Sequence, residues 1–200
     1  MPYEYRRMTP EQREAVRRLR AAKGYPLHSP PHPLNEKTYY LLTAVNFEHR
    51  HIMADDERRS NFQKTVLEKF REAESEISGW VFLKNHYHLL AFVPNFPKLS
   101  FIFNGLHGAS SRQWNLEDGL TGKRKVWYKF NDRMIRGEAH YYATLNYIHY
   151  NPVKHGYAKR MDEWEWSSFS WYLEEMGRDW LVEIWKKYPI KNYGDKWDIF

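Results

Sequence analysis

The hydrophobic positions of the chain follow two patterns: short apolar segments, and longer segments in which an apolar residue returns every three or four positions. The first pattern, rich in β-branched and aromatic residues, predicts strands. Within 80–93, two apolar halves are separated by Lys84, Asn85 and His86, which predict a tight turn or bulge. We therefore expect strands at 38–46, on both sides of that turn, and at 124–130.

The second pattern predicts helices that each bury one face. In the first of them Phe62, Val66 and Phe70 recur at every fourth position. Another must end near Asn151, because Pro152 disfavours helical geometry at the residue before it. We expect helices at 55–79, 98–114 and 138–150, followed by shorter ones at 167–175 and 179–187.

The order of these elements, β-α-β-β-α-β-α, predicts an α+β fold. Its first six elements match a ferredoxin-like βαββαβ arrangement, in which helices cover one face of an antiparallel sheet. A seventh element, a helix rich in tyrosine, follows the sixth. We expect this core at 35–158 and a C-terminal helical extension at 159–200.

A basic N-terminal arm is expected to precede the core, over 1–34. Thr9, Pro10 and Gln12 form a helix-start signature, in which Thr9 is the N-cap and Gln12 completes a capping box. Four arginines between 13 and 20 make this helix positive, and the proline-rich segment 26–33 favours an extended linker. The helix either contacts DNA or is simply solvated.

The composition limits the class of protein. Hydrophobic residues make up 42% and aromatic residues 18% of the 200 residues, so the chain can bury a core. It has no cysteine, which excludes disulfides and thiolate metal sites. No run of about 18 apolar residues and no apolar leader is present. We expect a cytoplasmic protein without a membrane partner.

A formal charge of +6 favours an acidic partner, of which nucleic acid is the commonest. Phosphate contacts would supply affinity and base contacts specificity. For each cation an ordinary solvated charge is an equal alternative. The candidate DNA-binding residues are Arg6, Arg7, Arg112, Lys123, Arg124, Lys125, Arg133, Arg136 and Lys154.

His86 and His88 form a candidate metal site. Residues two apart on a strand project to the same face, and each neutral imidazole offers one nitrogen to a divalent cation. Two hydrogen-bonded surface histidines are the alternative. A zinc hydrolase is a further possibility, but the sequence has no HExxH motif to complete its site.

Tyr147 is the candidate nucleophile. It lies off the apolar stripe that contains Leu145 and Ile148, so we expect it to face a cleft. Asn151 follows one helical turn later on the same side, where its amide oxygen could be a third metal ligand. The alternative is a half-buried tyrosine with its hydroxyl in water.

These groups suit phosphoryl transfer to tyrosine. A phenol with a pKa near 10 is a poor nucleophile, and a metal would stabilise charge on the non-bridging phosphate oxygens. Attack would join DNA to Tyr147 through a 5′-phosphotyrosine and free a 3′-hydroxyl. Because the bond energy is kept, a second DNA end could displace the tyrosine and complete strand transfer without ATP.

Several motifs resemble those of single-tyrosine transposases. The segment 85–90 (NHYHLL) is similar to their HUH motif, two histidines around a hydrophobic residue. The segment 147–156 (YIHYNPVKHG) resembles the tyrosine-helix signature of the REP-associated branch. The segment 132–136 resembles the basic segment that precedes that helix, and 166–168 also fits the pattern of the branch. The agreement runs from about 39 to 172, and the arm segment 28–32 resembles extensions seen on some members.

The resemblance implies an HUH nuclease domain, a tyrosine transposase that nicks and transfers single-stranded DNA. It implies His86 and His88 as ligands of Mg²⁺ or Mn²⁺, Tyr147 as nucleophile and Asn151 as a further ligand. Members of the branch recognise palindromic hairpin repeats in bacterial chromosomes, which implies a nucleoid-associated protein, either a monomer or a homodimer. Many relatives have proline where this chain has Lys84.

Two other functions remain open from the sequence. The chain could be a domesticated binder of hairpin DNA or RNA that no longer cleaves, or an unrelated metal hydrolase that uses His86 and His88 without a tyrosine adduct. The presence of His86, His88 and Tyr147 together argues against the first of these.

Overall fold

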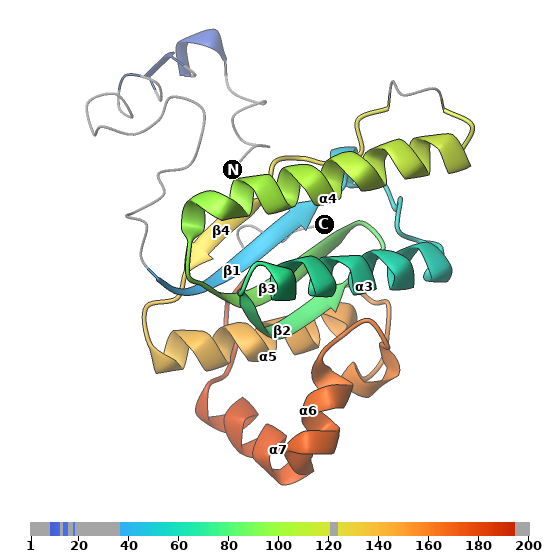
Figure 1. The fold of residues 1–200 in the computed structure, drawn as a ribbon. Helices are drawn as coiled ribbons and strands as arrows, with labels where there is room; N and C mark the ends of the chain where they lie inside the picture. Colours follow the sequence, from blue (N-terminus) through green and yellow to red (C-terminus); the bar gives the residue numbers. More distant parts are fainter. Residues whose placement is uncertain (1–8, 13, 16–17, 19–36, 121–123, 195–200) are drawn as a thin grey trace.

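A computed structural model describes residues 9–12, 14–15, 18, 37–120 and 124–194, and Figure 1 shows its fold. Four strands form one antiparallel sheet in the order β2-β3-β1-β4, which is the strand order of a ferredoxin-like βαββαβ unit. The predicted α+β fold is confirmed. The strands are β1 (Thr38–Val45), β2 (Glu76–Phe82), β3 (His86–Val93) and β4 (Asn131–Met134).

Helices cover both faces of this sheet (Figure 1). The two crossover helices lie on one face, and the helix after β4 lies on the other, with the last two helices beyond it. They are α3 (Asp56–Glu72) and α4 (Phe96–Glu117) on the first face, and α5 (Glu138–Lys154), α6 (Phe169–Glu175) and α7 (Gly177–Lys187) on the second. Two 3₁₀ turns are η1 (Phe47–His49) and η2 (Met161–Glu163).

The strand pleat divides the buried residues between two cores. On β1, Leu42 packs under α3 and α4, whereas its neighbour Leu41 packs under α5. On β3, Tyr87 and Leu89 belong to the first core, and Leu90 belongs to the second. Because both faces are covered, β3 is buried almost throughout, and its histidines turn toward α5 rather than toward water.

The fourth strand lies later than predicted. The sequence favoured a strand at 124–130, but this segment forms only an isolated bridge, between Trp127 and Asn46. Val126 and Trp127 instead fill the first core, and the chain pairs with β1 only from Asn131 onward. Burial of the aromatic side chain therefore takes precedence over strand propensity in this segment.

The first crossover helix is shorter than predicted. α3 ends at Glu72, and the chain already forms β2 at Glu76, so 78–79 is strand rather than helix end. Gly79 lies beneath α5, where a Cβ would come within 2.8 Å of Leu145 Cδ1. Gly79 therefore allows α5 to approach the sheet closely. The sequence pattern instead predicted the end of a helix at this glycine.

The helix α5 continues through Pro152, whereas the sequence predicted an end near Asn151. Pro152 is buried, and its carbonyl accepts hydrogen bonds from the backbone N–H groups of Tyr157 (2.9 Å) and Ala158 (3.3 Å). These contacts hold the last turn, so Asn151 keeps helical geometry one turn after Tyr147.

The N-terminal arm is described only in part. The predicted capping box at its start is present, since Thr9 N donates to Gln12 Oε1 (2.9 Å) and Gln12 N donates to Thr9 Oγ1 (3.3 Å). The linker 26–33 lies outside the described residues. Within the described ranges, no helix combines the length and the apolar character needed to cross a bilayer.

Candidate active site

Strand β3 and helix α5 bring four of the predicted site residues together. His86 and His88 face α5 from β3, and Tyr147 and Asn151 face β3 from α5. His86 Nε2 lies 3.2 Å from Asn151 Oδ1, and the Tyr147 hydroxyl lies 3.5 Å from His88 Nε2. The two imidazole rings are 5.0 Å apart between centroids. Candidate nucleophile and candidate ligands thus share one site.

Both imidazoles are held by their Nδ1 atoms. His88 Nδ1 lies 2.7 Å from Thr43 Oγ1, and His86 Nδ1 lies 2.7 Å from Asn85 Oδ1. A histidine anchored through one nitrogen presents the other in a fixed direction, which is the usual arrangement around protein metal ions. Here the presented atoms are the two Nε2 atoms, directed toward α5.

The donor set fits a divalent cation. Two imidazole nitrogens and one amide oxygen suit Mn²⁺, and they suit Mg²⁺ if water completes the shell. No group of three His, Cys, Asp or Glu side chains gathers for such an ion among the residues that the structure describes. An ion held by His86 and His88 would therefore need other donors, and Asn151 Oδ1, 3.2 Å from His86 Nε2, is one that lies within reach.

Tyr147 is fully buried, which differs from the expected position in a cleft. Its other side is covered by the segment after α7. The Tyr193 ring lies 5.1 Å from the Tyr147 ring, and a Cβ at Gly194 would come within 2.5 Å of Tyr147 Cε2. Gly194 has φ +95°, so glycine suits this position for two reasons. Tyr147 is thus enclosed between the sheet and the segment that follows α7.

Tyr193 is fixed by polar residues of α5. Thr144 Oγ1 donates to the carbonyl of His140 (2.7 Å), so it accepts from the Tyr193 hydroxyl (2.7 Å). The same hydroxyl lies 3.1 Å from His140 Nε2. Burial, with Arg133 and Arg136 nearby, lowers the pKa of His140, and burial raises the pKa of Tyr193.

Two of the predicted DNA-binding cations lie near this site, and a third lies at the start of α5. Lys154 Nζ is 5.4 Å from the centre of the Tyr147 ring, and the guanidinium of Arg133 is 5.9 Å from that of Tyr193. Arg136 is exposed just before α5 begins. Lys154 thus places positive charge beside the candidate nucleophile, Arg133 beside the tyrosine that covers it, and Arg136 at the start of α5.

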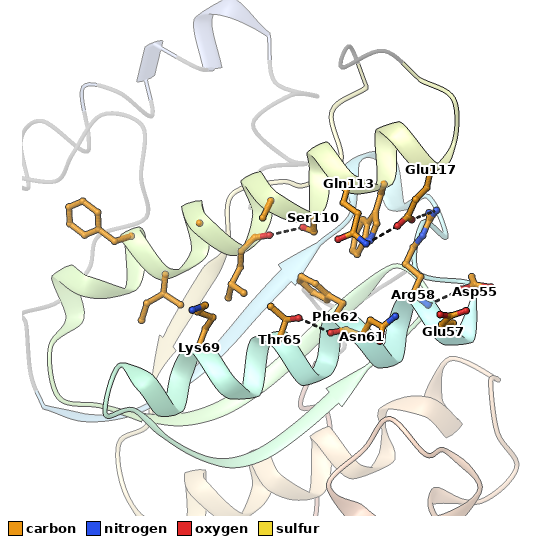
Figure 2. Close-up of a pocket in the computed structure, with 16 residues that line it drawn as sticks. Asp55, Glu57, Arg58, Asn61, Phe62, Thr65, Lys69, Ser110, Gln113 and Glu117 are labelled. Atoms are coloured by element: carbon orange, nitrogen blue, oxygen red, sulfur yellow. Dashed lines mark hydrogen bonds and ion pairs between the residues drawn. The ribbon is translucent and has the colours of Figure 1, made fainter.

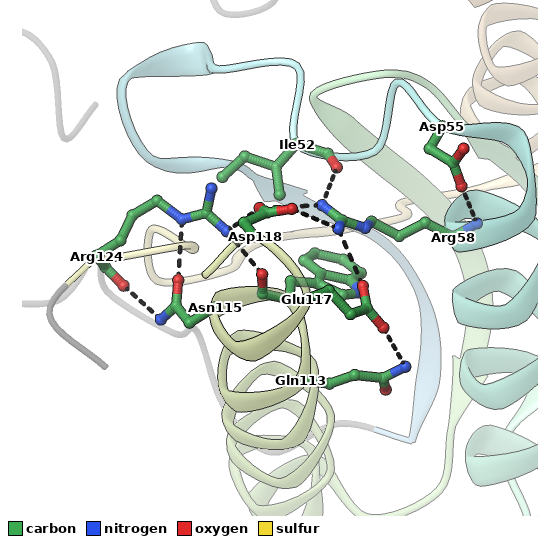
Figure 3. A network of polar contacts seen from close by, with 9 residues as sticks. Ile52, Asp55, Arg58, Gln113, Asn115, Glu117, Asp118 and Arg124 are labelled. Atoms are coloured by element: carbon green, nitrogen blue, oxygen red, sulfur yellow. Dashed lines mark hydrogen bonds and ion pairs between the residues drawn. The ribbon is translucent and has the colours of Figure 1, made fainter. Parts of the chain in front are cut away.

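The remaining cations lie elsewhere or are engaged. Arg124 donates to Asn115 Oδ1 (2.9 Å) and pairs with Asp118 (2.6 Å), as Figure 3 shows. Arg58 joins the same network and, with Arg124, lowers the pKa of Asp118. Arg112 is exposed on α4, and Lys125 lies over the Phe47 ring (4.8 Å). Arg6, Arg7 and Lys123 lie outside the described residues.

A separate hollow of about 530 Å³ lies between α3 and α4. Figure 2 shows Phe62, Thr65 and Ser110 along it, with Arg58 and Glu117 at one end. These helices cover the sheet face opposite to α5. None of the residues that line the hollow belongs to the histidine–tyrosine site, so the two are distinct.

Sequence reasoning did not identify Thr43 or Tyr193 as site residues. A signal existed for Thr43, because it pairs directly with His88 in the β1–β3 register. No sequence pattern indicated Tyr193, which reaches α5 only through the fold of the C-terminal helices. Asn85 was present in the histidine motif, but its contact with His86 follows from the turn geometry.

Two proteins of known family resemble the chain in sequence. It is 27% identical over 142 residues to the REP-associated tyrosine transposase of Escherichia coli (strain K12). The aligned residues cover 66% of this chain and 81% of that protein. The chain is similar in sequence to REP-associated tyrosine transposases. A putative member from Haemophilus influenzae (strain KW20 Rd) is 31% identical over 96 residues, 44% of this chain and 54% of that protein.

A solved structure shares the fold. The REP-associated tyrosine transposase bound to a REP hairpin superimposes with a TM-score of 0.60 and 23% identity, covering 75% of this chain and 88% of that one. No protein-family model matches the sequence. The relationship to REP-associated tyrosine transposases therefore rests on these relatives and on the shared α+β architecture.

Proposed function

We propose that this protein is a metal-dependent single-stranded DNA endonuclease and strand transferase that acts at hairpin repeats through a covalent phosphotyrosine. The observation that carries the proposal is the juxtaposition across β3 and α5: Tyr147 beside His88, and Asn151 beside His86. The relatives are named as transposases, and one is described as bound to a REP hairpin. Hairpin DNA is accordingly the proposed substrate class.

His86, His88 and Asn151 would hold Mg²⁺ or Mn²⁺, and the bound ion would stabilise negative charge on the scissile phosphate. The Tyr147 oxygen attacks phosphorus, and the bond between phosphorus and the 3′ oxygen breaks. The phenolic proton is released to solvent, and the departing 3′ oxygen takes up a proton. The DNA is then linked to Tyr147 through its 5′ phosphate.

Strand transfer is the reverse of this attack with a different DNA end. A 3′-hydroxyl from a second strand attacks phosphorus and releases Tyr147 as the phenol, so no external energy source is needed. Arg133, Arg136 and Lys154 are the cations that would contact phosphates around this step, a role supported by the position of Lys154 over Tyr147 and of Arg133 over Tyr193. Because each is near Tyr147 or the start of α5, their contacts would orient the strand rather than read its bases.

The proposal is tested by trapping the adduct. The protein is incubated with single-stranded hairpin DNA and Mn²⁺, and covalent protein–DNA species are separated under denaturing conditions. We expect an adduct in the wild type that is absent in Tyr147→Phe and absent with EDTA. Cleavage that persists in Tyr147→Phe would contradict the tyrosine mechanism. Tyr150→Phe, on the same helix, is the matched control and should form the adduct.

A non-cleaving hairpin-binding protein is the second candidate. The observation in its favour is the burial of Tyr147 beneath Tyr193 and Gly194, which leaves the nucleophile closed to DNA in this conformation. Hairpin binding without an adduct, across a panel of hairpins and both metals, would support this second function and contradict the first.

A further inference from the structure

The turn between β1 and α3 adopts an unusual backbone conformation beside the histidine motif. Glu48 (φ +57°) and His49 (φ +54°) are consecutive non-glycine residues in the left-handed region, which side chains disfavour. The turn is held by a bond from Asn46 N to the carbonyl of Asn85 (2.7 Å), and by one from Glu48 N to the Tyr128 hydroxyl (3.2 Å). Such strain commonly marks a functional constraint.

The result of this conformation is that the carbonyl of His49 faces the Asn85 side chain. Asn85 Nδ2 donates to it at 3.3 Å, and Asn85 is itself buried in the turn between β2 and β3. A carbonyl oxygen can only accept a hydrogen bond, so the amide nitrogen of Asn85 must point toward His49. The amide oxygen of Asn85 must then point the other way, toward His86.

This orientation selects one tautomer of His86. Asn85 Oδ1 is an acceptor and lies 2.7 Å from His86 Nδ1, so Nδ1 must carry the proton. In the neutral ring, Nε2 then holds the lone pair and faces Asn151 Oδ1 at 3.2 Å, so both atoms are directed as ligands of one cation. The opposite tautomer, in which Nε2–H donates to Asn151 Oδ1, would give up the shorter contact of 2.7 Å with Asn85 Oδ1. Neutral histidine in water ordinarily prefers the opposite form, with the proton on Nε2, so the turn works against that preference.

We propose that Asn85 is a positioning residue, which the carbonyl of His49 orients so that His86 is kept with Nδ1 protonated and Nε2 available as a metal ligand. The inference rests on the proposed function in one respect only, namely that His86 Nε2 acts as a metal ligand. The His88 side differs, because the Thr43 hydroxyl can either donate to or accept from His88 Nδ1. Asn85 therefore determines the tautomer of His86, whereas the Thr43 hydroxyl is compatible with either tautomer of His88.

The tautomer can be measured directly in the metal-free protein. Protein labelled with ¹⁵N at histidine is studied by long-range ¹H–¹⁵N NMR at a pH where the imidazoles are neutral, and the His86 signals are identified from their absence in His86→Gln. We expect His86 in the Nδ1–H form. A wild-type His86 in the Nε2–H form would overturn the proposal.

Two variants at position 85 separate positioning from mere packing. Asn85→Leu keeps the side-chain shape but removes the acceptor, so His86 should lose its preference for Nδ1–H. Asn85→Asp keeps an acceptor for Nδ1–H and should retain that tautomer. Retention of the Nδ1–H form in a folded Asn85→Leu protein would overturn the proposal. If that variant does not fold, loss of the Nδ1–H form in Asn85→Asp would overturn it.

Asn115→Leu is the matched control, because Asn115 is also a buried, hydrogen-bonded asparagine but lies on α4, on the sheet face opposite to α5. It should lower stability and leave the His86 tautomer unchanged. In a second measurement, Mn²⁺ binding by Asn85→Leu should weaken by about 10- to 100-fold relative to wild type. A wild type that binds no Mn²⁺ contradicts the proposed function, whereas the tautomer alone decides the role of Asn85.

Discussion

Tyr147 lies in the interior because contacts reach it from two directions. The sheet contributes His88, whose ring centroid is 5.4 Å away, and the C-terminal segment contributes Tyr193 at 5.1 Å. That Tyr147 and Asn151 share one side of α5 could be predicted from helical spacing, and both face β3. Its burial could not, because the covering residue is 46 positions later and touches α5 only in the folded chain.

Loosening this cover should speed the reaction of Tyr147. Tyr193→Phe keeps the ring but removes the hydroxyl contacts to Thr144 and His140. Hydrogen bonds of this kind contribute about 1 kcal/mol each. The uncovered state should therefore be populated about 5- to 30-fold more, and adduct formation with hairpin DNA should accelerate by a similar factor.

The control for this change is Tyr188→Phe, on the same C-terminal segment but in contact with Tyr142 rather than with Tyr147. Its rate of adduct formation should match that of the wild type. An unchanged or slower rate in Tyr193→Phe would show that the cover does not limit access to the nucleophile.

The distance between α5 and the sheet sets the geometry of the whole site. Histidines come from the strand and the tyrosine and asparagine from the helix, so their spacing depends on how closely the two elements approach. Strand β3 and helix α5 could be predicted from the pattern of their apolar residues. The path of 124–130 could not, because Trp127 stacks on Phe62 and His107 in a core that only the assembled fold creates.

A methyl group at position 79 should push α5 away from the sheet. In Gly79→Ala the new Cβ would lie 2.8 Å from Leu145 Cδ1 and 3.6 Å from Leu90 Cβ. Overpacking of this kind destabilises proteins by about 1–3 kcal/mol. We expect that loss in urea-induced unfolding, and a slower rate of adduct formation, since Tyr147 and Asn151 would move away from the histidines.

Gly105→Ala provides the matched comparison within α4. Nothing lies within 4 Å of a Cβ built there, and the position is helical. Alanine should stabilise the helix by about 0.5–1 kcal/mol without affecting the adduct. Equal stabilities for the two variants would contradict the close approach of α5 to β2.

At the scale of the whole molecule, one further histidine packs on each side of the sheet: His107 is half-buried and His149 is buried. His107, next to the Tyr87 hydroxyl (2.8 Å), belongs to the side of α3 and α4. His149, next to Ser168 Oγ (3.0 Å), belongs to the side of α6. Burial lowers the pKa of each to about 3. No sequence pattern distinguished His107 and His149 from the other eight histidines of the chain.

The lowered pKa values of His107 and His149 make the fold sensitive to acid. Their folded-state pKa values lie below the unfolded value of about 6.5, so the unfolded chain binds more protons between about pH 6.5 and 3. Stability is therefore complete above that window and falls as the pH is lowered through it. Relative to its value at neutral pH, the free energy of unfolding should be lower at about pH 5 by about 2 kcal/mol for each histidine.

Urea-induced unfolding at about pH 7 and pH 5 checks this expectation. His107→Gln keeps a polar partner for Tyr87 but cannot bind a proton in this range. Its stability should fall less between the two pH values than that of the wild type. An identical fall in both proteins would mean that His107 is not buried as the neutral imidazole.

The most direct test of the composite site is to identify which residue becomes linked to DNA. The wild-type protein is reacted with hairpin DNA and Mn²⁺ and digested with protease and nuclease, and the nucleotide-bearing peptide is sequenced by mass spectrometry. With fifteen tyrosines in the chain, the outcome is discriminating. We expect a 5′-linked nucleotide on Tyr147 alone. A nucleotide on any other residue, such as Tyr150 or Tyr193, would contradict it.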